Sequence, residues 1–188
     1  MGERVGRKRS EESRRAILEA ALGLLRARTY GALTIEAIAA EAGVGKQTIY
    51  RWWSTKADVV LEALTDHARA ISAPETGALE GDVRAFFEAT VKLLRGPRGS
   101  ALVLKGLMAE AQLDADFAPR FAAFIETRRS ALRAVLARHT REDLDAMVDM
   151  AFGALWYRLL VGHAPLDARF ADSIARLTAR AARKRSAS

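Results

Sequence analysis

Residues 33–56, LTIEAIAAEAGVGKQTIYRWWSTK, decide the fold of the N-terminal part of this chain. Two short runs with apolar residues at helical spacing flank Gly43, and a mixture of Lys, Gln, Tyr, Arg and Trp follows directly. Glycine suits the left-handed turn that ends a short helix. The spacing therefore predicts helices over 34–42 and 45–52 joined by a tight turn, which is a helix-turn-helix.

The second of these helices has two different faces. At about 100° per residue, Ile49 points away from Lys46, Gln47, Tyr50 and Arg51. Lysine can reach guanine or a phosphate, glutamine can pair with adenine, and tyrosine offers a ring to a thymine methyl and a hydroxyl to a phosphate. The polar face therefore fits the major groove of DNA. The alternative is a polar face that only meets water.

Helical periodicity continues along the whole chain, and no alternating run is long enough for a convincing strand. We expect an all-α protein of about nine helices. A capping-box pattern opens at Thr55, and the segment with Pro74 and Gly77 breaks the helix that follows. Besides the helix-turn-helix, the expected helices are 10–28, 55–71, 79–95, 98–112, 117–138, 142–162 and 167–184.

The composition excludes several classes of protein. The net charge is +7 with basic ends, which favours a polyanionic partner. Without cysteine there is no disulfide or thiolate zinc site, and His67, His139 and His163 are too scattered to indicate a metal, so we expect neither metal nor cofactor. The N-terminus has charge without an apolar stretch behind it, and no uncharged run has membrane-spanning length. We therefore expect a cytoplasmic protein with no membrane partner.

An enzyme is not expected. The only obvious carboxylate pairs, Asp114 with Asp116 and Asp143 with Asp145, are spaced i, i+2, which does not place them on one helix face. No glycine-rich phosphate loop or G-x-S-x-G elbow is present. A further alternative is a helical adaptor that binds acidic partners or a membrane through its basic termini, without sequence-specific DNA recognition.

Residues 43–64, GVGKQTIYRWWSTKADVVLEAL, closely resemble the third helix and the start of the fourth helix in the TetR family of transcriptional regulators. The family pattern there is Gly-Val-(Ser)-x-x-Thr-(Ile/Leu)-Tyr-x-(His/Trp)-(Phe/Trp)-x-(Ser/Thr)-Lys, and the resemblance spans about residues 10–70. It implies a helix-turn-helix domain followed by a larger helical domain that binds a small molecule and dimerises through its last two helices. It also implies a homodimer, usually a repressor, that binds a palindromic operator and is released by a small-molecule effector.

The break at residues 72–77 marks the expected domain boundary, and we expect four segments along the chain. The expected segments are a flexible basic tail over 1–9, a DNA-binding domain over 10–71, an effector-binding and dimerisation domain over 72–184, and a flexible tail over 185–188.

The resemblance also assigns roles within the DNA-binding domain. It implies that Thr34 and Lys56 hold phosphates, while Trp53 packs in the core. Gly45 replaces a serine that is frequent in the family, so any contact from that position comes from the backbone. The predicted DNA-binding residues are Thr34, Gly45, Lys46, Gln47, Thr48, Tyr50, Arg51, Trp52 and Lys56.

The helix expected over 142–162 carries two apolar stripes. One contains Leu155 and Leu159, and the other contains Met150 and Tyr157. A helix that is apolar on two sides needs two partners, which can be its own core and a second subunit. The alternative is the central helix of a monomer. The predicted dimer interface is Leu144, Val148, Ala151, Leu155, Leu159, Gly162, Phe170, Ile174 and Leu177.

An effector pocket requires large apolar side chains, which are also what any helical core contains. Arg128 and Arg158 are candidates for binding an acidic effector, or for ordinary solvated positions. The predicted pocket residues are Phe86, Phe87, Leu104, Met108, Phe121, Phe124, Ile125, Met150 and Trp156.

Overall fold

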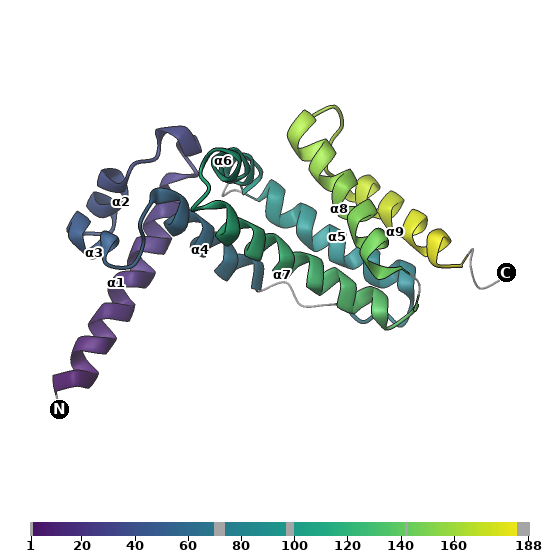
Figure 1. Cartoon of the computed structure of the whole chain (residues 1–188), viewed down its shortest axis with the longest axis horizontal. Coiled ribbons are helices and arrows are strands. Elements are labelled where there is room, and N and C mark those ends of the chain that lie inside the picture. Colours follow the sequence, from purple (N-terminus) through teal and green to yellow (C-terminus); the bar gives the residue numbers. More distant parts are fainter. Residues whose placement is uncertain (1, 70–73, 97–99, 142, 184–188) are drawn as a thin grey trace. The chain divides into compact units, whose positions relative to one another are not determined.

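The computed structural model describes residues 2–69, 74–96, 100–141 and 143–183, and over these ranges every regular element is a helix (Figure 1). The elements are α1 (Gly2–Leu24), the 3₁₀ turn η1 (Tyr30–Ala32), α2 (Ile35–Glu41), α3 (Lys46–Tyr50), α4 (Lys56–Arg69), α5 (Leu79–Arg95), α6 (Ser100–Leu113), α7 (Ala118–Ala137), α8 (Leu144–Val161) and α9 (Ala168–Arg183). The prediction of an all-α fold is confirmed.

Three differences from the expected helices appear near the N-terminus: α1 starts earlier, it ends at Leu24 and not at Arg28, and the turn η1 is additional. Helix α1 starts at Gly2 and not near Ser10, so residues 2–9, expected as a flexible tail, continue the helix. Several of these residues are Arg, Lys and Glu, which favour helix, and no proline interrupts them. The turn η1 was not expected. The predicted helix ends at 70–71, 98, 142 and 184, the linker start at 72–73 and the tail over 185–188 lie outside the described residues.

The chain forms two compact units. The N-terminal unit comprises Met1–Ala68 together with Pro97–Phe121, and the C-terminal unit comprises Arg69–Gly96 together with Ala122–Ser188. The first unit therefore extends past the break near Gly77 and includes α6. Its core contains fully buried apolar side chains from five helices and the loop before α2, namely Ile17, Ala21, Leu33, Ile38, Ile49, Val59, Val60 and Leu107.

Tyr30 explains why α6 belongs to the N-terminal unit. Gly106 lets α6 approach the Tyr30 ring so closely that a Cβ at position 106 would lie 2.5 Å from Tyr30 Cδ1. The Tyr30 hydroxyl donates to Glu110 Oε2 at 3.3 Å, while the Lys56 ammonium lies 4.8 Å from the ring centroid. Burial, followed by the charge of Glu110, raises the pKa of Tyr30 well above its ordinary value. Tyr30 thus joins η1 to α4 and α6.

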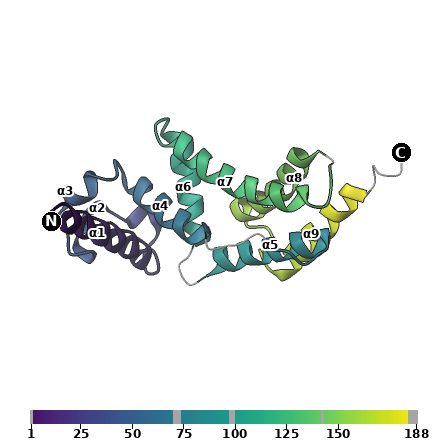
Figure 2. The ribbon, with the colours of Figure 1, turned by 90° about the horizontal axis from the view of Figure 1, so that it is seen from below.

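The C-terminal unit is built on α5 and α9, which lie side by side (Figures 1 and 2). Their contact is apolar and aromatic. Phe87 lies edge-on to Phe86 with centroids 5.4 Å apart and edge-on to Phe170 at 6.2 Å, and Phe152 of α8 tilts against Phe87 at 5.9 Å. Such edge-to-face pairs stabilise beyond the area they bury.

Asp82 ties the start of α5 to the end of α7. Its carboxylate is only 1% exposed, and it accepts hydrogen bonds from the Thr76 amide at 2.5 Å, the Thr76 hydroxyl at 2.7 Å and Arg138 at 3.1 Å. A ring nitrogen of His139 lies 2.7 Å away. Burial alone would raise the pKa of Asp82, but these hydrogen bonds and the Arg138 charge lower it well below its usual range.

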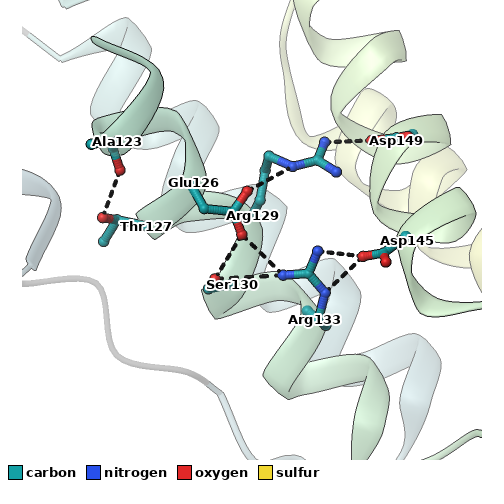
Figure 3. Close-up of polar contacts among 8 residues, drawn as sticks. All are labelled: Ala123, Glu126, Thr127, Arg129, Ser130, Arg133, Asp145 and Asp149. Carbon is teal, nitrogen blue, oxygen red and sulfur yellow. Dashed lines mark hydrogen bonds and ion pairs between the residues drawn. The ribbon is translucent and has the colours of Figure 1, made fainter. Parts of the chain in front are cut away.

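A ladder of two half-buried arginines and three exposed carboxylates connects α7 to α8, as Figure 3 shows. Arg133 donates from Nε to Asp145 at 2.8 Å and from Nη1 to Glu126 at 3.1 Å. Arg129 donates to Glu126 at 3.2 Å and forms an ion pair with Asp149. The two arginines of α7 therefore bridge carboxylates on both helices.

Candidate nucleic-acid interface

The turn between α2 and α3 is set by local backbone chemistry. The Thr34 hydroxyl caps α2 by accepting from the Ala37 amide at 3.2 Å. Gly43 has a φ of 65°, which glycine adopts without steric cost. The Val44 amide then donates to the carbonyl of Ala39 at 3.0 Å. These contacts fix where α3 starts.

Helix α3 has the two faces that its sequence predicts. Ile49 is fully buried, and Trp53 is buried with its indole N–H donating to Glu62 Oε2 at 2.9 Å. Trp53 is therefore a core residue. Facing solvent, in contrast, are Lys46, Gln47, Tyr50, Arg51 and Trp52, while Thr48 is half-buried.

The exposed residues of α3 and the turn after it form one surface, which we call the α3 surface: Lys46, Gln47, Tyr50, Arg51 and Trp52. Tyr50 is 52% exposed and Trp52 is 40% exposed. The Arg14 guanidinium lies 5.6 Å from the Trp52 ring centroid, which gives that ring a partner within the protein. A surface that interleaves cations, an amide and aromatic rings can contact both phosphates and base edges.

Glu36 of α2 borders the α3 surface through Lys46, and the sequence alone does not predict it there. Its carboxylate Oε1 lies 3.0 Å from the ammonium of Lys46, although both side chains remain largely exposed. A hydrogen bond from its own backbone amide and the Lys46 contact lower the pKa of Glu36, so it is ionised at neutral pH. The separation of ten positions gives no helical-spacing signal, because the turn brings these two residues together.

Lys56 has partners of its own within the protein. Its ammonium donates to the carbonyls of Leu33 at 3.1 Å and Tyr30 at 3.3 Å, besides lying over the Tyr30 ring. The carboxylate of Asp58, two positions on, accepts from the Thr55 amide at 3.0 Å and from Arg120 Nε at 2.6 Å. Lys56 therefore braces the start of α4, and its predicted phosphate contact stays a prediction.

The residues predicted for the dimer interface differ in their burial within the single chain. Val148, Ala151, Leu155, Leu159, Phe170 and Ile174 are buried within the single chain, Leu144 is half-buried, and only Gly162 and Leu177 are exposed. The buried residues belong to the core of the C-terminal unit: those on α8 form the stripe that faces the rest of that unit, and Phe170 and Ile174 lie on α9. On the other stripe, Met147 is buried, whereas Met150, Tyr157 and Val161 are exposed, as is neighbouring Leu160. The four exposed residues form what we call the exposed α8 face.

The predicted pocket residues lie in both units. Leu104, Met108 and Phe121 belong to the N-terminal unit, and Phe86, Phe87, Phe124, Ile125, Met150 and Trp156 belong to the C-terminal unit. Phe86, Phe87, Leu104 and Phe121 are buried, and Met150 is exposed.

The two candidate arginines each lie over an aromatic ring. Arg128 lies 5.0 Å from the Phe86 centroid and donates to Thr90 Oγ1 at 3.4 Å, and burial lowers its pKa. Arg158 lies 4.8 Å from the Phe170 centroid and donates to the carbonyl of Pro165.

Among the helices of the described ranges, none combines the length and the apolar composition that spanning a bilayer requires. Nor does the described part of the chain bring three or more His, Asp or Glu side chains together in a way that could hold a metal ion.

Two family models match the chain. The model described as bacterial regulatory proteins, tetR family, matches residues 17–63, and the model described as the C-terminal domain of tetracyclin-repressor-like proteins matches residues 73–178. The first match covers the helix-turn-helix, and the second covers more than half of the chain.

Relatives and solved structures agree with these matches. The uncharacterized HTH-type transcriptional regulator YdeS of Bacillus subtilis (strain 168) is 33% identical over 165 residues, which cover 83% of this chain and 82% of that protein. The TetR family transcription regulator SCO0332 is 28% identical with a TM-score of 0.75, over 89% of this chain and 97% of that one. FadR of Bacillus subtilis, solved in complex with stearoyl-CoA, has a similar fold at 16% identity with a TM-score of 0.68, over 87% and 96%.

Proposed function

The chain belongs to the TetR family of transcriptional regulators, and we propose that it binds a palindromic operator as a homodimer, represses transcription and is released by a small-molecule effector. The observation that carries DNA recognition is the α3 surface. Its hydrogen-bond donors and aromatic rings are exposed on one face, while Ile49 and Trp53 pack in the core on the opposite side.

The exposed α8 face supports the proposal of a homodimer. Met150, Tyr157, Leu160 and Val161 leave a contiguous helical segment with large apolar side chains in solvent, and Leu177 of α9 is also exposed. Exposed apolar patches mark interaction sites, and a second copy would bring the same face in a two-fold arrangement. The α3 helices of such a dimer would contact half-sites about 34–36 Å apart.

Effector release requires a link between effector binding and the α3 surface. Within the N-terminal unit, Tyr30 contacts both α4 through Lys56 and α6 through Gly106 and Glu110. We expect an effector that displaces α6 or tilts α4 to act through this contact. Changing operator occupancy from 99:1 to 1:99 requires about a 10⁴-fold preference of the effector for the DNA-incompetent state, roughly 5.5 kcal/mol.

DNA recognition is tested by selecting bound duplexes from a random pool and then measuring the affinity of the protein for the most enriched sequence by titration. A nanomolar, sequence-specific complex supports the proposal. Replacing Lys46, Gln47 and Tyr50 together with alanine should abolish the sequence preference. Binding that depends only on duplex charge would instead favour a helical adaptor with basic termini.

Effector coupling has a separate test. A compound found by thermal-shift screening would be titrated by calorimetry with and without saturating operator. Operator must weaken the binding of an inducer by the same factor by which the inducer weakens operator binding. Equal effector affinities in the two titrations would exclude coupling.

A further inference from the structure

We propose that Glu36 is a specificity-determining residue of the DNA-binding surface, because it holds the Lys46 ammonium and keeps it from binding phosphates indiscriminately. This inference rests on the proposed function of operator binding. It places an acidic residue beside the α3 surface, whose own polar groups are two cations, an amide, the Tyr50 hydroxyl and the Trp52 indole N–H.

The geometry places a negative charge beside the first residue of α3. Lys46 Nζ lies 3.0 Å from Glu36 Oε1, and the two side chains are 53% and 63% exposed. The Thr34 cap holds the first turn of α2, where Glu36 lies, and the Gly43 turn fixes the start of α3. Gly45, directly before Lys46, carries no side chain that could compete for the ammonium.

An exposed ion pair of this kind contributes little to folding. Exposed pairs generally stabilise proteins weakly, since solvent screens them and ordering two long side chains costs entropy. The contact is therefore better explained by what it does to a ligand of the α3 surface. A carboxylate at this position repels phosphates whatever the sequence of the duplex.

The ion pair with Glu36 also restricts which groups the Lys46 ammonium can contact. Lysine is a flexible point charge that binds any phosphate within reach. While Glu36 holds the ammonium near the start of α3, fewer phosphates are accessible to it, and a partner that takes the ammonium must compete with the carboxylate. A base edge at a fixed position in the correct operator can do so reproducibly, whereas an arbitrary duplex cannot. Rejection of wrong partners by a repulsive group is a general source of specificity.

The experiment uses the full chain with two duplexes, the operator obtained by selection and a scrambled duplex of equal length and composition. Glu36→Gln is compared with Glu41→Gln, which removes the same charge from an exposed position at the other end of α2. Both variants are also made in a Lys46→Met background. Affinities are measured by fluorescence anisotropy over a range of salt concentrations, and thermal unfolding confirms that each variant is folded.

We expect Glu36→Gln to tighten binding to the scrambled duplex by about tenfold and to the operator by about threefold or less, which lowers the specificity ratio at least about threefold. Neutralising one more phosphate per subunit should also steepen the slope of log affinity against log salt by about 0.9 per subunit. Glu41→Gln should change both affinities by the same factor. With Lys46→Met, the effect of Glu36→Gln on the ratio should disappear.

Three results would overturn the inference. Glu36→Gln could behave like Glu41→Gln, which would mean a general charge effect. It could weaken the operator alone, which would mean that Glu36 itself accepts from a base. Its effect on the ratio could also persist without Lys46. A wild-type chain that does not prefer its selected operator would contradict the proposed function itself, and that is a different observation from these three.

Discussion

The α3 surface and the exposed α8 face both place large side chains in solvent, but their sequences determine them differently. Helix α3 has one apolar side, marked by Ile49, so burying that side leaves Lys46, Gln47 and Tyr50 outside. Helix α8 is apolar on two sides, and only the packing of the C-terminal unit decides that Leu155 is 2% exposed while Tyr157 is 61% exposed. A helix with one apolar side can be oriented from its sequence, whereas a helix with two cannot.

The largest expected effect separates the two stripes of α8. Leu155→Ala removes buried methyl groups and leaves a cavity, so we expect the free energy of unfolding to fall by about 2–5 kcal/mol. Tyr157→Asp should leave the helical circular dichroism intact but convert dimers to monomers, because it places a charge on the exposed α8 face. Chemical unfolding and light scattering measure the two outcomes.

The opposite pattern would reverse the assignment of the stripes. A Tyr157→Asp protein that stays dimeric would move the dimer surface away from the exposed α8 face. If Leu155→Ala left the stability unchanged but converted the protein to monomers, the dimer interface would lie on the stripe with Leu155 and Leu159, as the sequence predicts.

This contrast shows what the sequence can predict. Helix limits were predicted closely for α5, expected over 79–95 and found at Leu79–Arg95, because glycine, proline and capping residues act locally. The sequence could not separate the two stripes of α8, because both satisfy the same 3.6-residue period, and the stripe with Leu155 and Leu159 is the one buried within the single chain. Which one faces the core depends on Phe152 and its contacts with Phe86 and Phe87, distant in sequence.

A second prediction concerns the α3 surface itself. Gln47→Ala removes an amide suited to pair with adenine, and we expect operator binding to weaken by about 1–3 kcal/mol per half-site, with relaxed preference at one or two base pairs. Binding titrations against operator variants measure it. A uniform loss across all base-pair substitutions would show that Gln47 contacts the backbone and not a base edge.

A third prediction tests why α6 belongs to the N-terminal unit. Gly106→Ala forces a methyl group against the buried Tyr30 ring, so we expect a loss of about 1–3 kcal/mol in unfolding free energy. Gly23→Ala is the matched control, because nothing lies within 4 Å of a Cβ at that position in α1. The control should stabilise by roughly 0.5–1 kcal/mol, since alanine favours helix. If both variants changed the unfolding free energy equally, α6 could move away from Tyr30 without loss of stability.

The contacts of Glu36 and Lys56 lay beyond sequence reasoning for a related cause. Each joins residues separated by a turn or a loop: Glu36 meets Lys46 across the α2–α3 turn, and Lys56 meets the carbonyls of Tyr30 and Leu33. Periodicity within one helix carries no information on such pairs. A motif identifies which residues a surface contains, and the fold decides which of them already have partners.

The smallest expected effect concerns the charge ladder of α7 and α8. Its charged side chains belong to neither the α3 surface nor the exposed α8 face. Arg129→Met should break the contacts with Glu126 and Asp149, but both carboxylates are more than half exposed, so water replaces much of the interaction. We expect the Tm to fall by at most about 2 °C at low salt and by less at 1 M salt, where the Debye length shrinks to about 3 Å. Arg180→Met, at an exposed position on α9 outside the ladder, is the matched control. Differential scanning calorimetry at the two salt concentrations measures the difference. A loss that is large and independent of salt would show that the ladder fixes the position of α8, and hence of its exposed face, more firmly than surface ion pairs usually do.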